Sequence, residues 1–143
     1  MKKILILFTA LFALMFAGCK GADEAESESL QDALLELCED STAKDYVNLL
    51  FDDSLKTDEH ITVEFKDDIL TIKMNNAKPC KIFLEDSKVR VEHGTYNLFI
   101  KNIRFVENSA GNILQLNSNN YALAVFFDNK SLSRFGFGPA YLN

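Results

Sequence analysis

The sequence is poor in the residue types on which most enzyme and metal motifs depend. Its 143 residues include no tryptophan, two histidines and three cysteines. Neither His60 nor His93 belongs to a spaced metal motif such as H-E-x-x-H, and no G-x-S-x-G, phosphate-binding loop or Cys-x-x-Cys occurs. The common hydrolytic and metal-dependent templates therefore lack their required residues, and we expect no metal or other cofactor.

Positive charge and long apolar runs are also scarce. Lysine and arginine number 15 against 21 acidic residues, which gives a formal net charge of −6 and disfavours nucleic acid as a partner. The longest uncharged apolar run, Ile4 to Ala17, has 14 residues, whereas a membrane-spanning helix needs about 20. We therefore expect this run to be removed after export rather than to stay in a membrane.

The first nineteen residues resemble the signal of a bacterial lipoprotein. The basic start, Met1 to Lys3, and the apolar run lead into Phe16-Ala17-Gly18-Cys19, which is similar to the lipobox of that family: an apolar residue, two small residues and a cysteine. The resemblance implies that the Cys19 thiol carries a diacylglyceryl group, that residues 1–18 are cleaved off, and that the lipid anchors the protein in the cell envelope. An ordinary secretory signal cleaved near a cysteine is the alternative.

The residues after this signal bear on location and domain organisation. Removing residues 1–18 takes away two lysines, which lowers the formal charge to −8, so attachment must come from the lipid rather than from anionic headgroups. In enteric bacteria, Lys20 rather than aspartate after the cysteine would favour the outer membrane. Residues 19–29 are acidic and serine-rich and predict a flexible tether, whereas residues 30–143 are long enough for one globular domain.

Two short amphipathic helices are predicted at the beginning of this domain. Ser29 starts a capping signal, and apolar residues from Leu30 onward recur at intervals of three and four residues. A second capping signal at Thr42 precedes a run with the same spacing. The predicted helices cover residues 30–39 and 43–51.

From His60 the apolar period changes to two, which predicts strands. A two-residue loop at Asp67-Asp68 places the apolar residues of both flanking strands on one face. A loop at Asp86-Ser87 does the same, and it also sets Lys81 opposite Glu92 on the solvated face. Each register predicts an antiparallel hairpin.

Further strands are predicted in the second half of the domain. The alternation slips between Ile100 and Ile103, which indicates a bulge or a bend onto a new face, and a loop at Ser118-Asn119 would pair Leu116 with Tyr121. The whole pattern predicts an α+β fold that is mainly β. In it, two short N-terminal helices are followed by an antiparallel up-and-down meander of seven to eight strands, which curls into a small barrel or half-barrel.

The two cysteines of the predicted domain, Cys38 and Cys80, have competing interpretations. Both lie on core faces, and a disulfide bond between them would persist outside the cytoplasm and add roughly 4 kcal/mol of stability; two free buried thiols are the alternative. The hairpin register also places Cys80 beside His93, and an imidazole can activate a neighbouring thiol as a nucleophile. The plainer interpretation of this pair is a buried apolar cysteine and a histidine bonded to the backbone.

The C-terminal segment interleaves aromatic residues with glycine. Phe135, Phe137 and Tyr141 are candidates for lining an apolar pocket or a partner-binding edge. Alternatively, these side chains close the β structure, and the glycines permit the bend.

These observations favour a lipid-anchored envelope protein that binds a protein or an apolar ligand and catalyses nothing. The segment NSNNYALAVFFDNKSL is similar to the barrel strands of small lipid-anchored lysozyme inhibitors, which would imply inhibition of a cell-wall-degrading enzyme. The chain lacks the tryptophan which that family carries, so no functional residue is transferred from it. A purely structural envelope lipoprotein and an enzyme that uses Cys80 and His93 are the other hypotheses.

Overall fold

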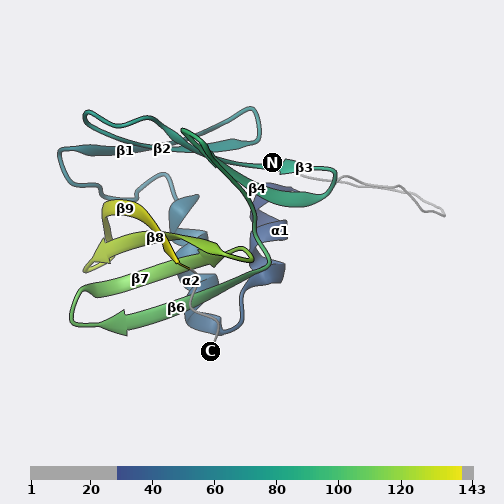
Figure 1. Ribbon diagram of the computed structural model, residues 1–143. Helices are drawn as coiled ribbons and strands as arrows, with labels where there is room; N and C mark the ends of the chain where they lie inside the picture. The colour runs from purple at the N-terminus through teal and green to yellow at the C-terminus, as the bar shows by residue number, and fades with distance from the viewer. Residues whose placement is uncertain (1–28, 140–143) are drawn as a thin grey trace, which may run out of the picture.

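The computed structural model describes residues 29–139, which form two helices and nine strands in two antiparallel sheets (Figure 1). This confirms an α+β fold that is mainly β. The helices are α1 (Leu30–Leu37) and α2 (Ser41–Leu50). The first sheet has the order β1 (Ile61–Lys66), β2 (Ile69–Met74), β3 (Cys80–Glu85), β4 (Lys88–His93) and β5 (Tyr96–Phe99). The second has the order β6 (Asn102–Asn108), β7 (Gly111–Asn117), β8 (Tyr121–Asp128) and β9 (Ser131–Pro139).

Both helices begin at side-chain caps. The Ser29 hydroxyl accepts a hydrogen bond from the backbone N–H of Asp32 at 3.1 Å, as the capping signal predicts. The second helix begins at Ser41 because the carboxylate of Asp40 accepts from the N–H of Ala43 at 2.7 Å, so its cap lies before the predicted signal. The helices therefore occupy residues 30–50 rather than the N-terminus of the chain.

The first two hairpins have the predicted registers. Asp67-Asp68 joins β1 to β2, and Asp86-Ser87 joins β3 to β4. All four loop residues have positive φ angles of 54° to 66°, which is typical of type I′ turns. A third turn of this kind, Asn129-Lys130, joins β8 to β9 with φ angles of 53° and 69°. These turns match the right-handed twist of the strands, although none of them contains glycine.

The predicted barrel is wrong, because the chain leaves one sheet before it starts the other. The N–H of Ile100 donates to the carbonyl of Val89 in the first sheet at 2.9 Å, and the N–H of Lys101 donates to the carbonyl of Asn117 in the second at 2.7 Å. The predicted bend between Ile100 and Ile103 is therefore a change of sheet. It divides one predicted strand into β5 and β6, so the described residues contain nine strands rather than seven or eight, in two open sheets.

The predicted loop between β7 and β8 is also displaced by one residue. Ser118 and Tyr121 face each other, since the N–H of Ser118 donates to the carbonyl of Tyr121 at 2.9 Å, and Asn119-Asn120 forms the loop. Leu116 consequently pairs with Leu123 instead of Tyr121. A shift of two residues keeps the same side chains on the core face, because the side-chain period of a strand is two.

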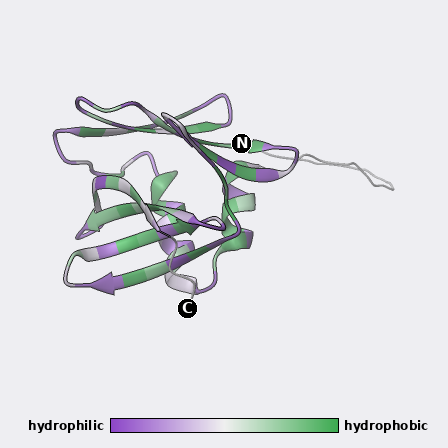
Figure 2. Cartoon of the chain, viewed as in Figure 1, coloured by the Kyte–Doolittle hydropathy of each residue, from purple (hydrophilic) through white to green (hydrophobic). Residues whose placement is uncertain are grey.

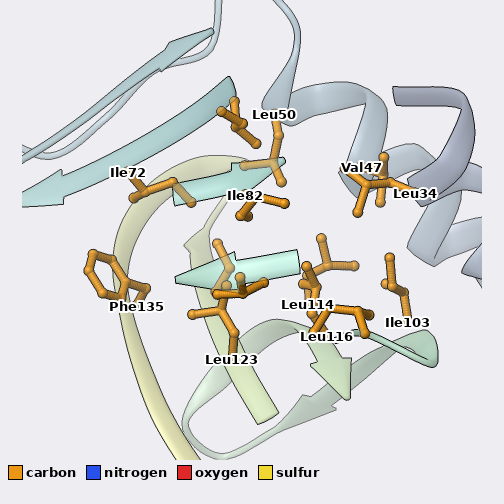
Figure 3. Close-up of a cluster of buried hydrophobic side chains, with 14 of the residues drawn as sticks. Leu34, Val47, Leu50, Ile72, Ile82, Ile103, Leu114, Leu116, Leu123 and Phe135 are labelled. Atoms are coloured by element: carbon orange, nitrogen blue, oxygen red, sulfur yellow. The ribbon is translucent and has the colours of Figure 1, made fainter. Parts of the chain in front are cut away.

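The core lies where the two sheets and the two helices meet. Helix α1 contacts β4 and β6, and α2 contacts β6 and β7. Figure 2 shows hydrophobic residues along the strands and hydrophilic residues at the hairpin turns. In Figure 3, side chains of the helices and of both sheets point toward one another, among them Leu34, Val47, Ile72, Ile82, Ile103, Leu114, Leu116 and Leu123. Each of these eight residues is at most 1% exposed, so one shared core holds the sheets together.

We expect Lys130→Gly to stabilise the protein. Lys130 has a φ of 69°, a left-handed conformation that strains residues with a Cβ, and relieving it should raise the free energy of unfolding by about 1 kcal/mol. Lys73→Gly in the middle of β2 is the control; because glycine weakens a strand, it should lower that free energy by about 1 kcal/mol. Urea denaturation of both variants measures the difference, and equal effects would contradict the assigned turn.

Candidate functional site

A groove of about 520 Å³ lies on the face of the second sheet that points away from the helices. The inner face is identified by Tyr46 of α2, whose ring stacks on Phe105 of β6 at 4.7 Å between centroids. Because side chains alternate along a strand, the preceding residue, Arg104, belongs to the outer face. The groove has a floor of Ala122, Ala124, Gly136 and Gly138, and the polar residues that line it include Arg104, Gln115 and Arg134.

The floor of the groove is flat because four small residues meet across two strands. Ala122 of β8 pairs with Gly138 of β9, and Ala124 pairs with Gly136. A Cβ atom built on either glycine would have no neighbouring atom within 4 Å. The space above the floor is therefore open, and a ligand can approach the backbone closely there.

The carboxamide of Gln115 is the buried polar group of the groove. Gln115 is only 7% exposed, and its Oε1 atom has no hydrogen-bond partner within the described part of the chain. It pairs with Arg104 on β6 and with Ala124 on β8, so it lies beside the floor. A buried acceptor without a partner destabilises a folded protein by about 1 to 3 kcal/mol, which makes Gln115 the clearest candidate for a ligand contact.

Arg134 supplies an exposed guanidinium at the rim of the groove. Its Cζ lies 3.6 Å from the ring centroid of Phe126, the residue opposite it on β8, and this stacking restrains the planar group. Within residues 29–139 Arg134 forms no salt bridge. The groove residues include no Asp or Glu, so the groove is locally positive in an acidic protein.

Arg90 on the first sheet differs from Arg134, because its guanidinium already has acidic and hydrogen-bonding partners. It forms ion pairs with Glu85 and, at 3.6 Å, with Glu92, and its Nε donates to Asn97 at 2.5 Å. The guanidinium also lies 5.8 Å from the ring centroid of Phe83. Its charge is already neutralised by neighbours on the same sheet, so the outer face of the first sheet is a weaker candidate for anion binding.

The candidate aromatic residues form a seam between the two sheets. Phe135 is buried and lies edge-on to the His93 ring at 5.3 Å. Phe137 stacks on His93 at 5.1 Å and on Tyr96 at 4.8 Å. It pairs with Leu123, so its ring lies on the face of β9 opposite to the floor of the groove. Phe135 thus serves mainly as core and Phe137 as seam; Tyr141 lies outside the described residues.

The two cysteines of the described region, Cys38 and Cys80, are free thiols in this structure. Cys38 caps α1 and pairs with Ile103 of the second sheet, whereas Cys80 lies in the first sheet opposite Ile72. Burial raises the pKa of the Cys38 thiol to about 11, with a further contribution from the charge of Asp40. Burial alone raises the pKa of the Cys80 thiol to about 12.

These pKa values argue against the alternative hypothesis that Cys80 and His93 form a catalytic centre. An activated cysteine needs a lowered pKa, and the pKa of Cys80 changes in the opposite direction. The Nδ1 atom of His93 lies 3.3 Å from the carbonyl oxygen of Pro79, as the plainer interpretation expects. His93 therefore belongs to the aromatic seam.

Sequence reasoning missed most of the groove. One signal was present: small residues stand at alternate positions of two neighbouring strands, Ala122 and Ala124 and then Gly136 and Gly138, which leaves part of one sheet face without bulk. No local pattern marks Gln115, because its missing partner depends on how the strands assemble. Within residues 29–139, no group of three or more His, Cys, Asp or Glu side chains is placed to hold a metal ion, and neither helix there is long and apolar enough to cross a membrane.

We expect both thiols of the folded protein to react slowly with a disulfide reagent at pH 8. A thiol of pKa 11 is about 100-fold less ionised at that pH than one of pKa 9, so Cys38 should react about 100-fold more slowly than a model peptide. Cys80 should react more slowly still, and unfolding should restore both rates. The experiment uses Cys19→Ser to remove the third thiol, and rapid labelling of Cys80 in the folded protein would contradict its burial.

Comparison with known proteins gives no match to a protein-family model, to a curated protein or to a solved structure. The function is therefore argued from the groove and its residues.

Proposed function

We propose that this protein is a lipid-anchored component of the bacterial cell envelope, on the outer membrane, whose domain binds a ligand or partner in the groove without transforming it. Support for the anchor comes from the motif Phe16-Ala17-Gly18-Cys19, which lies outside the described residues. Support for binding comes from the groove of the second sheet. The two parts are independent and are tested separately.

The single observation that carries the binding proposal is the carboxamide oxygen of Gln115, which borders an open groove and has no hydrogen-bond partner within residues 29–139. If this buried position served only the fold, an apolar side chain there would make the protein more stable. The volume of about 520 Å³ falls within the range of about 300 to 1,000 Å³ that is typical of small-ligand sites. A ligand that pairs with Gln115 explains both features.

The chemistry of the groove favours binding over catalysis. A carboxamide does not ionise, and an arginine stays protonated at any physiological pH. Neither group is suited to exchange protons with a substrate near pH 7. The two thiols have raised pKa values and lie elsewhere, so they do not supply a nucleophile to the groove.

The geometry of the second sheet also bears on the two other hypotheses, a lysozyme inhibitor and a purely structural lipoprotein. The segment that is similar to lysozyme-inhibitor barrel strands forms the end of β7, β8 and the start of β9 in an open sheet rather than a barrel. A purely structural lipoprotein needs no buried polar group beside an open cavity. We therefore favour a small ligand or a peptide over a cell-wall enzyme as the occupant of the groove.

We expect ligands to bind at the groove and to be recovered unchanged. The full chain, labelled with ¹⁵N and kept in detergent micelles, would be screened against short peptides, organic acids, sugar phosphates and glycan fragments. Amide shifts should concentrate around Gln115, Ala124 and Gly136. Binding should be lost in Gly136→Val, which fills the floor, and kept in Thr71→Val on the first sheet. Shifts confined to β1–β5 would exclude the groove.

We expect Cys19→Ser to release the protein from membranes. The thiol of Cys19 is the proposed attachment point of the lipid, so the variant should lose incorporation of an alkyne-labelled fatty acid. It should also move from the detergent phase to the aqueous phase on cloud-point separation. Cys38→Ser is the matched control and should keep both label and detergent partition. Incorporation that survives in Cys19→Ser would refute the anchor.

A further inference from the structure

We propose that the groove binds the carboxyl end of a short extended peptide, with the peptide carboxylate on Arg134 and a neighbouring backbone amide on Gln115. This inference rests on the proposed binding function and names the chemical class of its ligand. It is carried by three features of the groove within residues 29–139: Arg134 forms no salt bridge, the Gln115 Oε1 atom has no hydrogen-bond partner, and the floor has no side chain beyond Cβ.

Charge complementarity places the carboxylate of the peptide on Arg134. Arg134 forms no salt bridge within residues 29–139, and the groove residues include no acidic side chain, although the protein as a whole has a formal charge of −6. Arg134 is exposed at the rim, and its guanidinium is stacked on Phe126 at 3.6 Å. A restrained planar guanidinium is the side chain best suited to hold a carboxylate through two parallel hydrogen bonds.

The position of Gln115 relative to Arg134 assigns the amide. Gln115 lies on β7, Ala124 is its partner on β8, and Arg134 lies on β9 one side-chain repeat along. Ideal sheet spacings put the Cα atoms of Gln115 and Arg134 about 12 Å apart, and two long side chains can converge across this distance on two or three extended residues of about 3.3 Å each. A backbone N–H of such a peptide donates to Gln115 Oε1, which has no other partner within residues 29–139.

The floor explains why the ligand is a peptide rather than a free anion. Ala122, Ala124, Gly136 and Gly138 offer no side chain beyond Cβ, and the space above both glycines is empty to 4 Å. A peptide backbone can therefore lie flat on the sheet face. A free anion would use Arg134 and leave both the floor and the buried Gln115 carboxamide without a partner.

The test uses N-acetyl-Ala-Ala as the probe and its C-terminal amide as the matched control. Both are titrated into the full chain in detergent micelles, and binding is followed by ¹⁵N amide shifts. The acid should bind at least tenfold more tightly than the amide, because only the acid can neutralise Arg134. Sodium acetate at the same ionic strength should produce no saturable shift at Gln115.

Three variants of the groove and one control separate the contributions. Arg134→Gln should weaken binding of the acid at least tenfold and leave binding of the amide unchanged, whereas Lys73→Gln, which removes an exposed lysine from the first sheet, should change neither. Gly136→Val should abolish binding of both peptides. Gln115→Leu should weaken binding and, because it removes an unpaired buried acceptor, should raise the urea midpoint of the ligand-free protein. A merely structural glutamine would show a lower midpoint.

Several results would overturn the inference. Equal binding of acid and amide, or equal binding of acetate, excludes recognition of a peptide carboxylate. Binding that appears only after residues 140–143 are deleted assigns the groove to the chain itself, and a dimer in sedimentation that Gly136→Val dissociates assigns it to a second copy. If other compounds of the screen bind in the groove and the peptide acid does not, the proposed binding function stands and this inference alone fails.

Discussion

Alternation of side chains along β7, β8 and residues 134–138 of β9 is the constraint on which both the core and the groove depend. In each strand, the residues that face the helices are buried and apolar, such as Leu114, Leu123 and Val125, and belong to the shared core. The alternate residues face the other way and include Gln115, Ala124 and Gly136 of the groove. A shift of one residue in any of these strands would exchange the two sets. The register that buries the core therefore also positions the groove, and no separate structure is needed to build it.

A single change of sheet determines the rest of the architecture. The backbone N–H of Ile100 is hydrogen-bonded to the first sheet and that of Lys101 to the second sheet, so the chain passes between the two sheets within two residues. Across this division the sheets are joined by packing, and the aromatic seam contributes to it because Phe137 stacks on both His93 and Tyr96. Phe137 lies between Gly136 and Gly138 of the groove floor, so a displacement of the sheets relative to each other would also move this floor.

The sequence predicted the features that depend on local rules and missed those that depend on long-range assembly. The loops Asp67-Asp68 and Asp86-Ser87 were found because a two-residue loop sets the register of a whole hairpin. The later loop was misplaced by one residue, yet the core face was still correct, because the error in register was two. The division into two sheets was missed because it depends on which distant carbonyl each N–H meets after Phe99. The groove was missed for the same reason: the unpaired Oε1 of Gln115 is a property of the assembled sheet.

Two kinds of destabilising feature occur in this protein, positive φ angles in turns and an unpaired buried polar atom. Their positions in the fold show that they have different causes. The positive φ angles of Asp67, Asp86 and Asn129 are unfavourable for residues with a Cβ, but they lie in exposed two-residue turns whose geometry the hairpins require. Gln115 meets no such requirement, because an apolar side chain at its position would satisfy the same strand register and the same burial. Its carboxamide oxygen, which has no partner within residues 29–139, also borders a cavity rather than the core. The fold gains nothing from a polar atom at this place, which agrees with the binding that we propose for the groove.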